Sequence, residues 1–270
     1  MKYIITESQY NLLLETDKEQ KVLELPGIEY FGSWETMQKF LVKRGNPLFS
    51  IDGDLDLRKS DIRSLGNLVS VSGNLDLTHS SIKSLGNLEY VGGTLNLSNT
   101  SVKSLGNLKS VGNIEKNHGD LYLFLSSVQN LGNLESVGGK LDLYKTPIQS
   151  LGNLESVGGD LDLHGAKIQS LGNLKSVGGM LEMAKTKIES LGNLEYVGGE
   201  LHLIDSKIKS LGKLVSVGSW VNLAWTPIED LGNLKEVGGD LYLRGTPVSK
   251  MYSEDEISGM IDVGGDIYLI

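Results

Sequence analysis

The chain contains no cysteine among its 270 residues, which excludes disulfide bonds and thiolate metal sites and suits a reducing compartment. Long apolar runs are missing as well. The first residues, Met1 to Glu7, reach an acidic side chain before any apolar run develops, so we expect neither a signal peptide nor a membrane-spanning segment. These absences together predict a cytoplasmic protein.

Positive charge is scarce relative to negative charge. Lys and Arg number 25 against 34 Asp and Glu, which gives a net charge of −9 at pH 7. Nucleic acids are bound through Lys and Arg side chains that neutralise phosphates, and anionic membrane surfaces attract the same residues. The charge balance therefore argues against nucleic-acid and membrane partners.

Residue patterns that carry chemistry are lacking too. The sequence shows no catalytic motif. Its histidines are scattered without the spacing of metal ligands, at His79, His118, His164 and His202. We therefore expect a protein that is not an enzyme and that has no cofactor and no metal site.

What the chain has in abundance is a repeat. The phrase Leu-x-Leu, or a close variant of it, recurs every 20 residues, with two steps of 26 residues. Its first residues are Leu55, Leu75, Leu95, Leu121, Leu141, Leu161, Leu181, Leu201, Val221, Leu241 and Ile267. A fixed period this short predicts a stack of similar coils and not a globular domain with a central pocket.

Each coil can be numbered from the first residue of its Leu-x-Leu phrase. The residues at positions 1 and 3 alternate with outward residues, which predicts a β-strand with both leucines inward. Further apolar residues recur at positions 8, 11, 14 and 17. Burying six such side chains does not offset the conformational entropy that is lost when 20 residues are ordered. One coil therefore cannot fold alone, and we expect each strand to pair with its neighbours in a parallel ladder.

Periodic glycines mark the corners of the coil. Position 12 is Gly in all nine coils that carry the phrase Leu-Gly-Asn-Leu or its Lys213 variant, which predicts a positive φ or a close backbone approach there. Gly-Gly before the strand, as at Gly158-Gly159, predicts a second corner. Asn at position 13 is expected to satisfy backbone groups of the turn.

The two ends of the chain depart from the repeat. We divide the chain into an N-terminal helical segment and cap (1–50), the repeat solenoid (51–250), and a C-terminal cap with a last strand (251–270). The exposed end of a solenoid needs a cap because it presents an apolar cross-section and unpaired strand edges.

Local signals predict the elements in these ends. In the N-terminal segment, residues 2–5 read as a strand, and Thr6 opens a capping-box pattern for a helix that runs to about residue 15. Ser33 is placed to cap a second helix, which we expect to cover the first coil. Near the C-terminus, Ser253 and Glu256 form another capping-box pattern before a strand at 267–269.

The repeat resembles the leucine-rich repeat family. The pattern Leu-x-Leu-x-x-(Thr/Ser)-x-Ile, followed by Leu-x-x-Leu-x-x-Val, covers about residue 51 to the C-terminus, and its Gly-Gly-x-Leu-x-Leu phrase is similar to coils of the receptor L-domain. Position 6 holds Thr or Ser where that family usually has Asn, so we expect its hydroxyl to bond backbone at a tight bend. The resemblance implies protein recognition through the strand face.

Taken together, these features predict a right-handed β-solenoid of 10–11 short coils, with one parallel β-sheet face and a small N-terminal helical cap. A second resemblance concerns the N-terminal segment. The phrase Ile-Thr-Glu-Ser-Gln-Tyr at residues 5–10, joined to this repeat, is similar to leucine-rich-repeat proteins of tailed bacteriophages. It implies a viral protein that acts on a host protein in the host cytoplasm.

The outward strand positions are 20, 2 and 4. Positions 20 and 2 are acidic with aromatic interruptions, and two patches stand out as candidate partner-binding residues. The first patch follows a six-residue insertion at 113–118 and comprises Tyr122, Phe124, Tyr144 and His164. The second patch comprises His202, Trp220, Trp225, Tyr242 and Arg244. Aromatic residues with an Arg on a polar surface are typical of binding hot spots.

Several functions are compatible with these residues. The leading hypothesis is a non-enzymatic scaffold that presents its strand face to a protein partner. The alternative is a glycan-binding or glycan-cleaving solenoid with aromatic platforms beside Asp160 and Asp162. The acidic column at Asp142, Asp162 and Glu182 could instead hold calcium or be a solvated face without a ligand.

Two further alternatives concern the patches themselves. The insertion could fold over the first patch and bury it. The two tryptophans of the second patch could pack against another copy of the chain, so we expect a monomer or a weak homo-oligomer.

Overall fold

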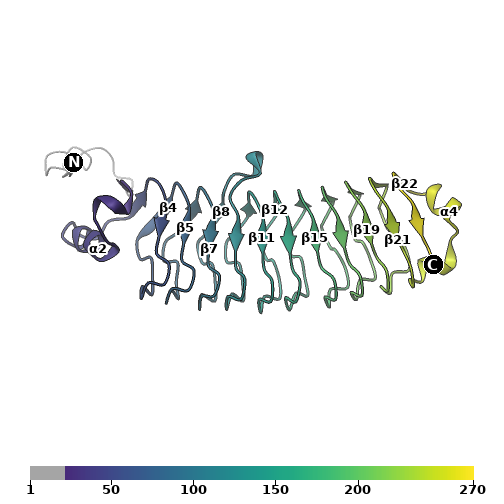
Figure 1. The fold of residues 1–270 in the computed structure, drawn as a ribbon, viewed down its shortest axis with the longest axis horizontal. Helices are drawn as coiled ribbons and strands as arrows, with labels where there is room; N and C mark the ends of the chain where they lie inside the picture. Colours follow the sequence, from purple (N-terminus) through teal and green to yellow (C-terminus); the bar gives the residue numbers. More distant parts are fainter. Residues whose placement is uncertain (1–21) are drawn as a thin grey trace.

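The computed structural model describes residues 22–270, which form a β-solenoid of about ten coils (Figure 1). The predicted repeat architecture is therefore confirmed. The strand expected at residues 2–5 and the helix expected from Thr6 lie outside the described residues.

The strand predicted at Leu-x-Leu forms a parallel ladder along the whole solenoid, in sheet B. Each coil contributes one short strand in unshifted register, so that Leu141 pairs with Leu161 and Asp142 with Asp162. Sheet B contains β3 (Leu55–Asp56), β5 (Leu75–Asp76), β7 (Leu95–Asn96), β9 (Leu121–Tyr122), β11 (Leu141–Asp142), β13 (Leu161–Asp162), β15 (Leu181–Glu182), β17 (Leu201–His202), β19 (Val221–Asn222), β21 (Leu241–Tyr242) and β23 (Ile267–Tyr268).

A second parallel sheet, sheet A, runs along the coil where position 17 carries its Val. We expected one sheet face, and the structure adds this one. Sheet A contains β1 (Leu23–Leu25), β2 (Phe49–Ile51), β4 (Leu68–Val71), β6 (Tyr90–Val91), β8 (Ser110–Val111), β10 (Ser136–Val137), β12 (Ser156–Val157), β14 (Ser176–Val177), β16 (Tyr196–Val197), β18 (Ser216–Val217), β20 (Glu236–Val237) and β22 (Asp262–Val263).

The core is a continuous column of the repeated apolar side chains. In the coil that starts at Leu141, all six predicted core residues are buried, namely Leu141, Leu143, Ile148, Leu151, Leu154 and Val157. The same positions are buried in the neighbouring coils, so the core continues through the stack. This confirms the inward assignment of each repeated position.

Two kinds of glycine corner are present, for different reasons. At position 12 all nine glycines adopt φ between +59° and +62°, a region that disfavours side chains with a Cβ. In the Gly-Gly corner the backbones of adjacent coils approach closely, so a Cβ on Gly178 would overlap the carbonyl oxygen of Gly158. At position 13 the side chains of Asn67 and Asn233 donate to backbone carbonyls of the preceding segment or coil, at Asn46 and Gly212, so the expected bond to backbone is present at these two positions.

A tight bend after each sheet B strand occupies positions 5 and 6. Position 5 has positive φ in every coil, for example +54° at Lys145 and +69° at Gly165. At position 6 every Thr hydroxyl donates to the carbonyl oxygen three residues earlier, as Thr146 does to Leu143 at 2.8 Å, and Ser60 does the same. The buried hydroxyls of Ser80, Ser126 and Ser206 make no hydrogen bond. The expected bond from this hydroxyl to backbone is therefore confirmed for the threonines and for Ser60, and it is absent at the other three serines.

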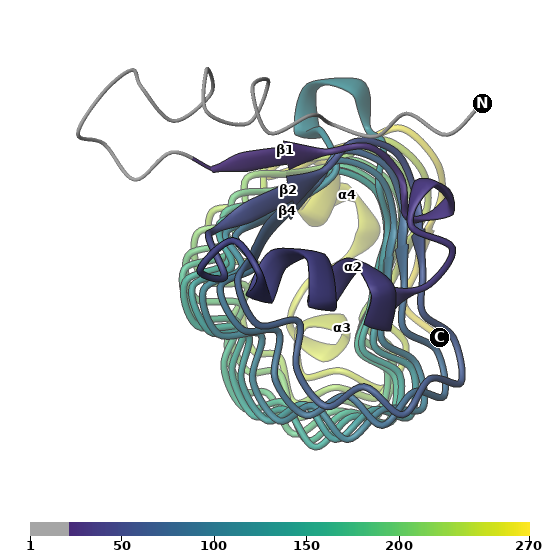
Figure 2. The ribbon, with the colours of Figure 1, turned by 90° about the vertical axis from the view of Figure 1, so that its left-hand side faces the viewer.

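The N-terminal end is closed by helix α2 (Trp34–Val42), which lies across the end of the first coil (Figure 2). Ser33 caps it by accepting the Thr36 N–H, as predicted, and Trp34 turns its ring toward Phe49 with 6.4 Å between centroids. A short 3₁₀ helix, η1 (Ile28–Tyr30), precedes α2. Sheet A already begins in this segment with β1 and β2, before residue 51.

The insertion forms a compact loop that stands out from the corner between the two sheets (Figures 1 and 2). It contains the 3₁₀ helix η2 (Ile114–Lys116). Asn113 and His118 close its base through two backbone hydrogen bonds of 2.7 and 3.2 Å. The loop therefore projects from the stack and leaves the register of the ladders on either side unchanged.

The C-terminal end is closed by α3 (Val248–Met251) and α4 (Glu254–Ser258). Ser253 and Glu256 form the predicted capping box, and Ile257 buries its side chain against the last coil. Strand β23 then joins sheet B, close to the expected bounds. No helix within residues 22–270 combines the length and apolar character needed to cross a membrane.

The outward face of sheet B as candidate binding site

The acidic columns of this face hold backbone groups in place. At position 2, the carboxylate of Asp142 accepts the N–H of Tyr144, and that of Asp162 accepts the N–H of His164, both at 2.9 Å. At position 20, Asp160 accepts the Met180 N–H of the next coil at 2.8 Å. A carboxylate has acceptor sites to spare after one such bond, so the second oxygen stays open to other donors.

Three tyrosines on this face share one arrangement with an aspartate two residues earlier. The phenol of Tyr122 donates to Asp120 at 2.8 Å, and that of Tyr242 donates to Asp240 at 3.0 Å. The hydrogen bond to Asp120, with burial and the charge of Asp120 adding to it, raises the pKa of Tyr122 to about 12. Tyr268 repeats the arrangement with Asp266 at 3.4 Å.

The first predicted patch contains a ladder of stacked rings at position 4. The ring centroids of Phe124 and Tyr144 lie 5.5 Å apart at 14°, and those of Tyr144 and His164 lie 5.6 Å apart at 9°. Lys145 adds an ammonium group 4.8 Å from the Tyr144 ring centroid. Because the rings face one another along the solenoid, they present their edges to solvent.

The second predicted patch contains a chain of four rings on the last coils. His202 stacks on Trp220 at 4.3 Å, Trp220 meets Tyr242 edge-on at 6.0 Å, and Tyr242 stacks on Tyr268 at 4.6 Å. We call these four residues the aromatic cluster. All lie at positions 20 and 2, on the outer surface of sheet B.

His202 fixes the cluster to the acidic columns. Its Nδ1 lies 3.0 Å from Glu182 Oε2 in the preceding coil, and its Nε2 lies 2.9 Å from Glu200 Oε2. The ring is thereby held on three sides, by two carboxylates and by the indole of Trp220. A ring held in this way presents a preorganised surface that loses little side-chain entropy on binding.

Trp225 and Arg244 lie apart from the aromatic cluster, at the bend that follows the strand. Trp225 sits at position 5 with φ +61° and is 55% exposed. Its ring covers Gly245 of the next coil, and the Arg244 guanidinium carbon lies 5.5 Å from its centroid. Among the described residues no ring contact joins Trp225 to Trp220, so the structure divides the second patch into two sites.

Two residues of this surface were missing from the sequence analysis. Tyr268 extends the aromatic cluster, and Glu200 holds His202. The signal was present as the repeated phrases Asp240-Leu241-Tyr242 and Asp266-Ile267-Tyr268, which place a ring and its carboxylate on one face of a strand. Among the described residues, no group of three or more His, Asp and Glu side chains is arranged to hold a metal ion.

The chain matches no protein-family model, no curated protein and no solved structure. The residues of the strand face therefore carry the functional argument.

Proposed function

We propose that this protein is a non-enzymatic scaffold that binds a protein partner through the outer face of sheet B, with the aromatic cluster at the energetic centre. The observation that supports it best is that cluster itself. Aromatic side chains held by neighbours and surrounded by polar residues are typical of hot spots. The solenoid adds a long, stiff surface on which they are displayed.

The partner's matching surface is basic. Positions 20 and 2 of sheet B carry eleven acidic side chains against one lysine, Lys140. Carboxylates such as those of Asp142 and Asp162 retain an oxygen that can accept from Arg or Lys. Complementary charge of this kind speeds association and selects the partner, so binding should weaken as salt is raised.

Glycan binding is less well supported on this face. A sugar packs on the open face of an aromatic ring, whereas Tyr144 has a ring on either side and Trp220 is covered by His202. Glycan cleavage needs two carboxylates in unlike environments. Asp160 and Asp162 instead both accept one backbone N–H bond on the same open surface.

A capture experiment with matched variants tests the proposal. Trp220→Ala/Tyr242→Ala removes the centre of the aromatic cluster, whereas Tyr90→Ala/Tyr196→Ala removes two exposed tyrosines on sheet A. Immobilised wild-type protein should retain a partner from a lysate of the native host, the sheet A variant should retain it equally, and the cluster variant should lose it. The resemblance of residues 5–10 to phage proteins makes a host cytoplasmic protein the first partner to test.

Two results would contradict this function. One is equal retention by both variants, provided that their melting curves show them to be folded. The other is a concentration-dependent dimer in light scattering that is lost in Trp225→Ala, because the tryptophans would then serve contact between copies of the chain.

A further inference from the structure

Cations gather on a different side of the solenoid, although the chain as a whole is acidic. After the bend, positions 7–10 form a third side of each coil, between sheet B and the corner at position 12. Outward positions 7 and 9 carry seven cations against three acids (Asp61, Glu189 and Glu229). The cations are Arg63, Lys83, Lys103, Lys167, Lys187, Lys207 and Lys209.

Three of these lysines form one column on consecutive coils. The N–H of Lys167 donates to the Thr146 carbonyl of the preceding coil, and Lys207 does the same to Thr186, so the coils remain in register here. Adjacent ladder rungs are about 4.8 Å apart. Lysines stacked on successive rungs bring like charges near one another, which is unfavourable unless an anion lies between them.

Lysines at position 15, beside sheet A, have acidic partners instead. Lys109 pairs with Glu89 at 2.7 Å, and Lys175 pairs with Glu155 at 2.8 Å, each across one coil step. The column Lys167, Lys187 and Lys207 contains no acidic residue. No ion pair within residues 22–270 neutralises these three ammonium groups, which leaves them available to an external anion.

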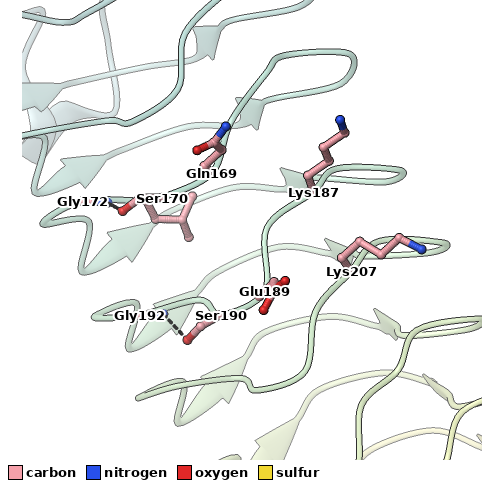
Figure 3. A pocket seen from close by; sticks show the side chains of 9 residues that line it. Gln169, Ser170, Gly172, Lys187, Glu189, Ser190, Gly192 and Lys207 are labelled. Atoms are coloured by element: carbon pink, nitrogen blue, oxygen red, sulfur yellow. Dashed lines mark hydrogen bonds between the residues drawn. The ribbon is translucent and has the colours of Figure 1, made fainter.

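An open groove of about 820 Å³ lies beside this column (Figure 3). Its lining is formed by Gln169, Ser170, Leu171, Gly172, Lys187, Glu189, Ser190, Gly192 and Lys207. Ser170 and Ser190 accept the N–H groups of the glycines two residues on, at 3.0 and 3.1 Å, so each hydroxyl proton remains free to donate. Glu189 pairs with Lys209 at 2.9 Å, which offsets its charge.

The composition of this groove points to the class of ligand. Leu171 is its one apolar side chain, and no aromatic residue lines it. Bases of single-stranded nucleic acids bind by stacking on aromatic rings, and protein hot spots need buried aromatic or aliphatic anchors. Hydroxyl, amide and ammonium groups in a shallow groove suit a ligand that combines many hydroxyls with repeated negative charge.

We propose that this groove is a second binding site, which takes an acidic oligosaccharide lying along the solenoid. Its carboxylate or sulfate groups meet Lys187 and Lys207, and its hydroxyls bond Gln169, Ser170 and Ser190. The site lies on a different side of the coil from the aromatic cluster and does not depend on the function proposed for sheet B.

The test uses the full chain and an oligogalacturonate of defined length as the probe, with a sulfated oligosaccharide of equal length beside it. Lys187→Gln/Lys207→Gln removes the cations of the groove. Lys109→Gln/Lys175→Gln makes the same change of net charge at paired lysines beside sheet A. By isothermal titration, wild type and the second variant should bind alike, and the first variant should bind about tenfold more weakly.

The probe preferred by wild type identifies the acidic group. Binding should weaken with added salt, and a methyl-esterified oligogalacturonate should not bind. The proposal is overturned if neither acidic probe binds, if both variants lose affinity equally, or if an oligothymidylate binds more tightly than either sugar. The last result would assign the groove to nucleic acid.

Discussion

Position 6 of each coil holds a small side chain in the bend after the sheet B strand. Where this side chain has a hydroxyl group, a hydrogen bond from it to the backbone stabilises the bend. Thr186 and Thr226 donate to the carbonyls three residues earlier at 2.8 and 2.7 Å. Ser206 lies between them in the stack, is equally buried, and makes no hydrogen bond with its hydroxyl. The methyl group of Thr restricts χ1, which a Ser side chain does not do.

Ser206→Thr should therefore stabilise the protein by about 1 kcal/mol through one added hydrogen bond. Thermal unfolding measures the change. Ser60→Thr is the matched control, because the Ser60 hydroxyl already donates to Leu57 at 2.7 Å and gains nothing from the replacement. A fall in the melting temperature of Ser206→Thr would show that the column has no room for the extra methyl group.

Position 5 offers a second test, because its backbone is left-handed whatever residue occupies it. Leu125 has φ +52° and exposes 48% of its surface. The same position in the preceding coil is Asn99, a residue type that tolerates this left-handed region. Leu125→Asn should raise stability by up to about 1 kcal/mol, and the β-branched Leu125→Val should lower it. Equal melting temperatures for the three proteins would contradict the argument.

The hydrogen bond from Tyr122 to Asp120 predicts a dependence on pH. Because the pKa of Tyr122 is raised from 10.0 to about 12 in the folded protein, its contribution to stability is fully present below pH 10 and is lost as the pH rises toward 12. Near neutral pH, Tyr122→Phe should be less stable than wild type by about 1 kcal/mol and should therefore unfold at a lower temperature. That difference should shrink between pH 10 and 12.

Melting curves of both proteins across this pH range provide the measurement. Tyr90→Phe, at a half-exposed position on sheet A, serves as the control for general effects of alkali. If the stability difference between Tyr122→Phe and wild type stayed constant up to pH 12, the hydrogen bond donated by the Tyr122 phenol would not be its cause.

At the scale of elements, the Gly-Gly corner limits how closely successive coils can stack. Gly178→Ala places a methyl group against the carbonyl of Gly158 and should destabilise the protein by about 1–3 kcal/mol, as overpacked sites do. Gly259→Ala is the control, since its nearest neighbours would lie at 3.4 and 3.5 Å and its φ is −75°. Chemical denaturation measures the difference, and equal denaturant midpoints for the two variants would contradict the prediction.

The elements also show how far sequence reasoning reaches. Leu141 and Leu143 flank an outward residue, and this alternation is enough to predict the strand of sheet B. The strand Ser156–Val157 contains one inward residue, so no alternation reveals it, and its pairing depends on the neighbouring coils. Sheet A was missed for that reason.

The same limit applies to the candidate site. Trp220 and Trp225 are close in sequence and were assigned to one patch. Trp220 directly precedes strand β19 (Val221–Asn222), whereas Trp225 lies in the bend that follows the strand, so the strand separates them. By contrast, Phe124, Tyr144 and His164 are 20 residues apart and still stack, because the period places them on adjacent rungs.

At the scale of the whole molecule, stability depends on contacts between neighbours in the stack, so each end must be closed. The C-terminal cap buries Ile257 and Ile261 over the last coil, while β22 and β23 end the two sheets. Burial of these two side chains contributes about 4 kcal/mol. Without them, the core at Val248 and Leu243 faces solvent and the last ladder edges are unpaired.

A chain ending at Lys250 should therefore melt at a lower temperature and aggregate through its exposed edges. A chain ending at Gly264 loses β23 but keeps α4 and both isoleucines, which separates the loss of the cap from the loss of the last strand. We expect this second chain to remain monomeric in light scattering and to melt closer to wild type. If the chain ending at Lys250 is also monomeric and melts at the same temperature as the chain ending at Gly264, the solenoid does not need its C-terminal cap. Ile257 and Ile261 would then not be required to cover the last coil.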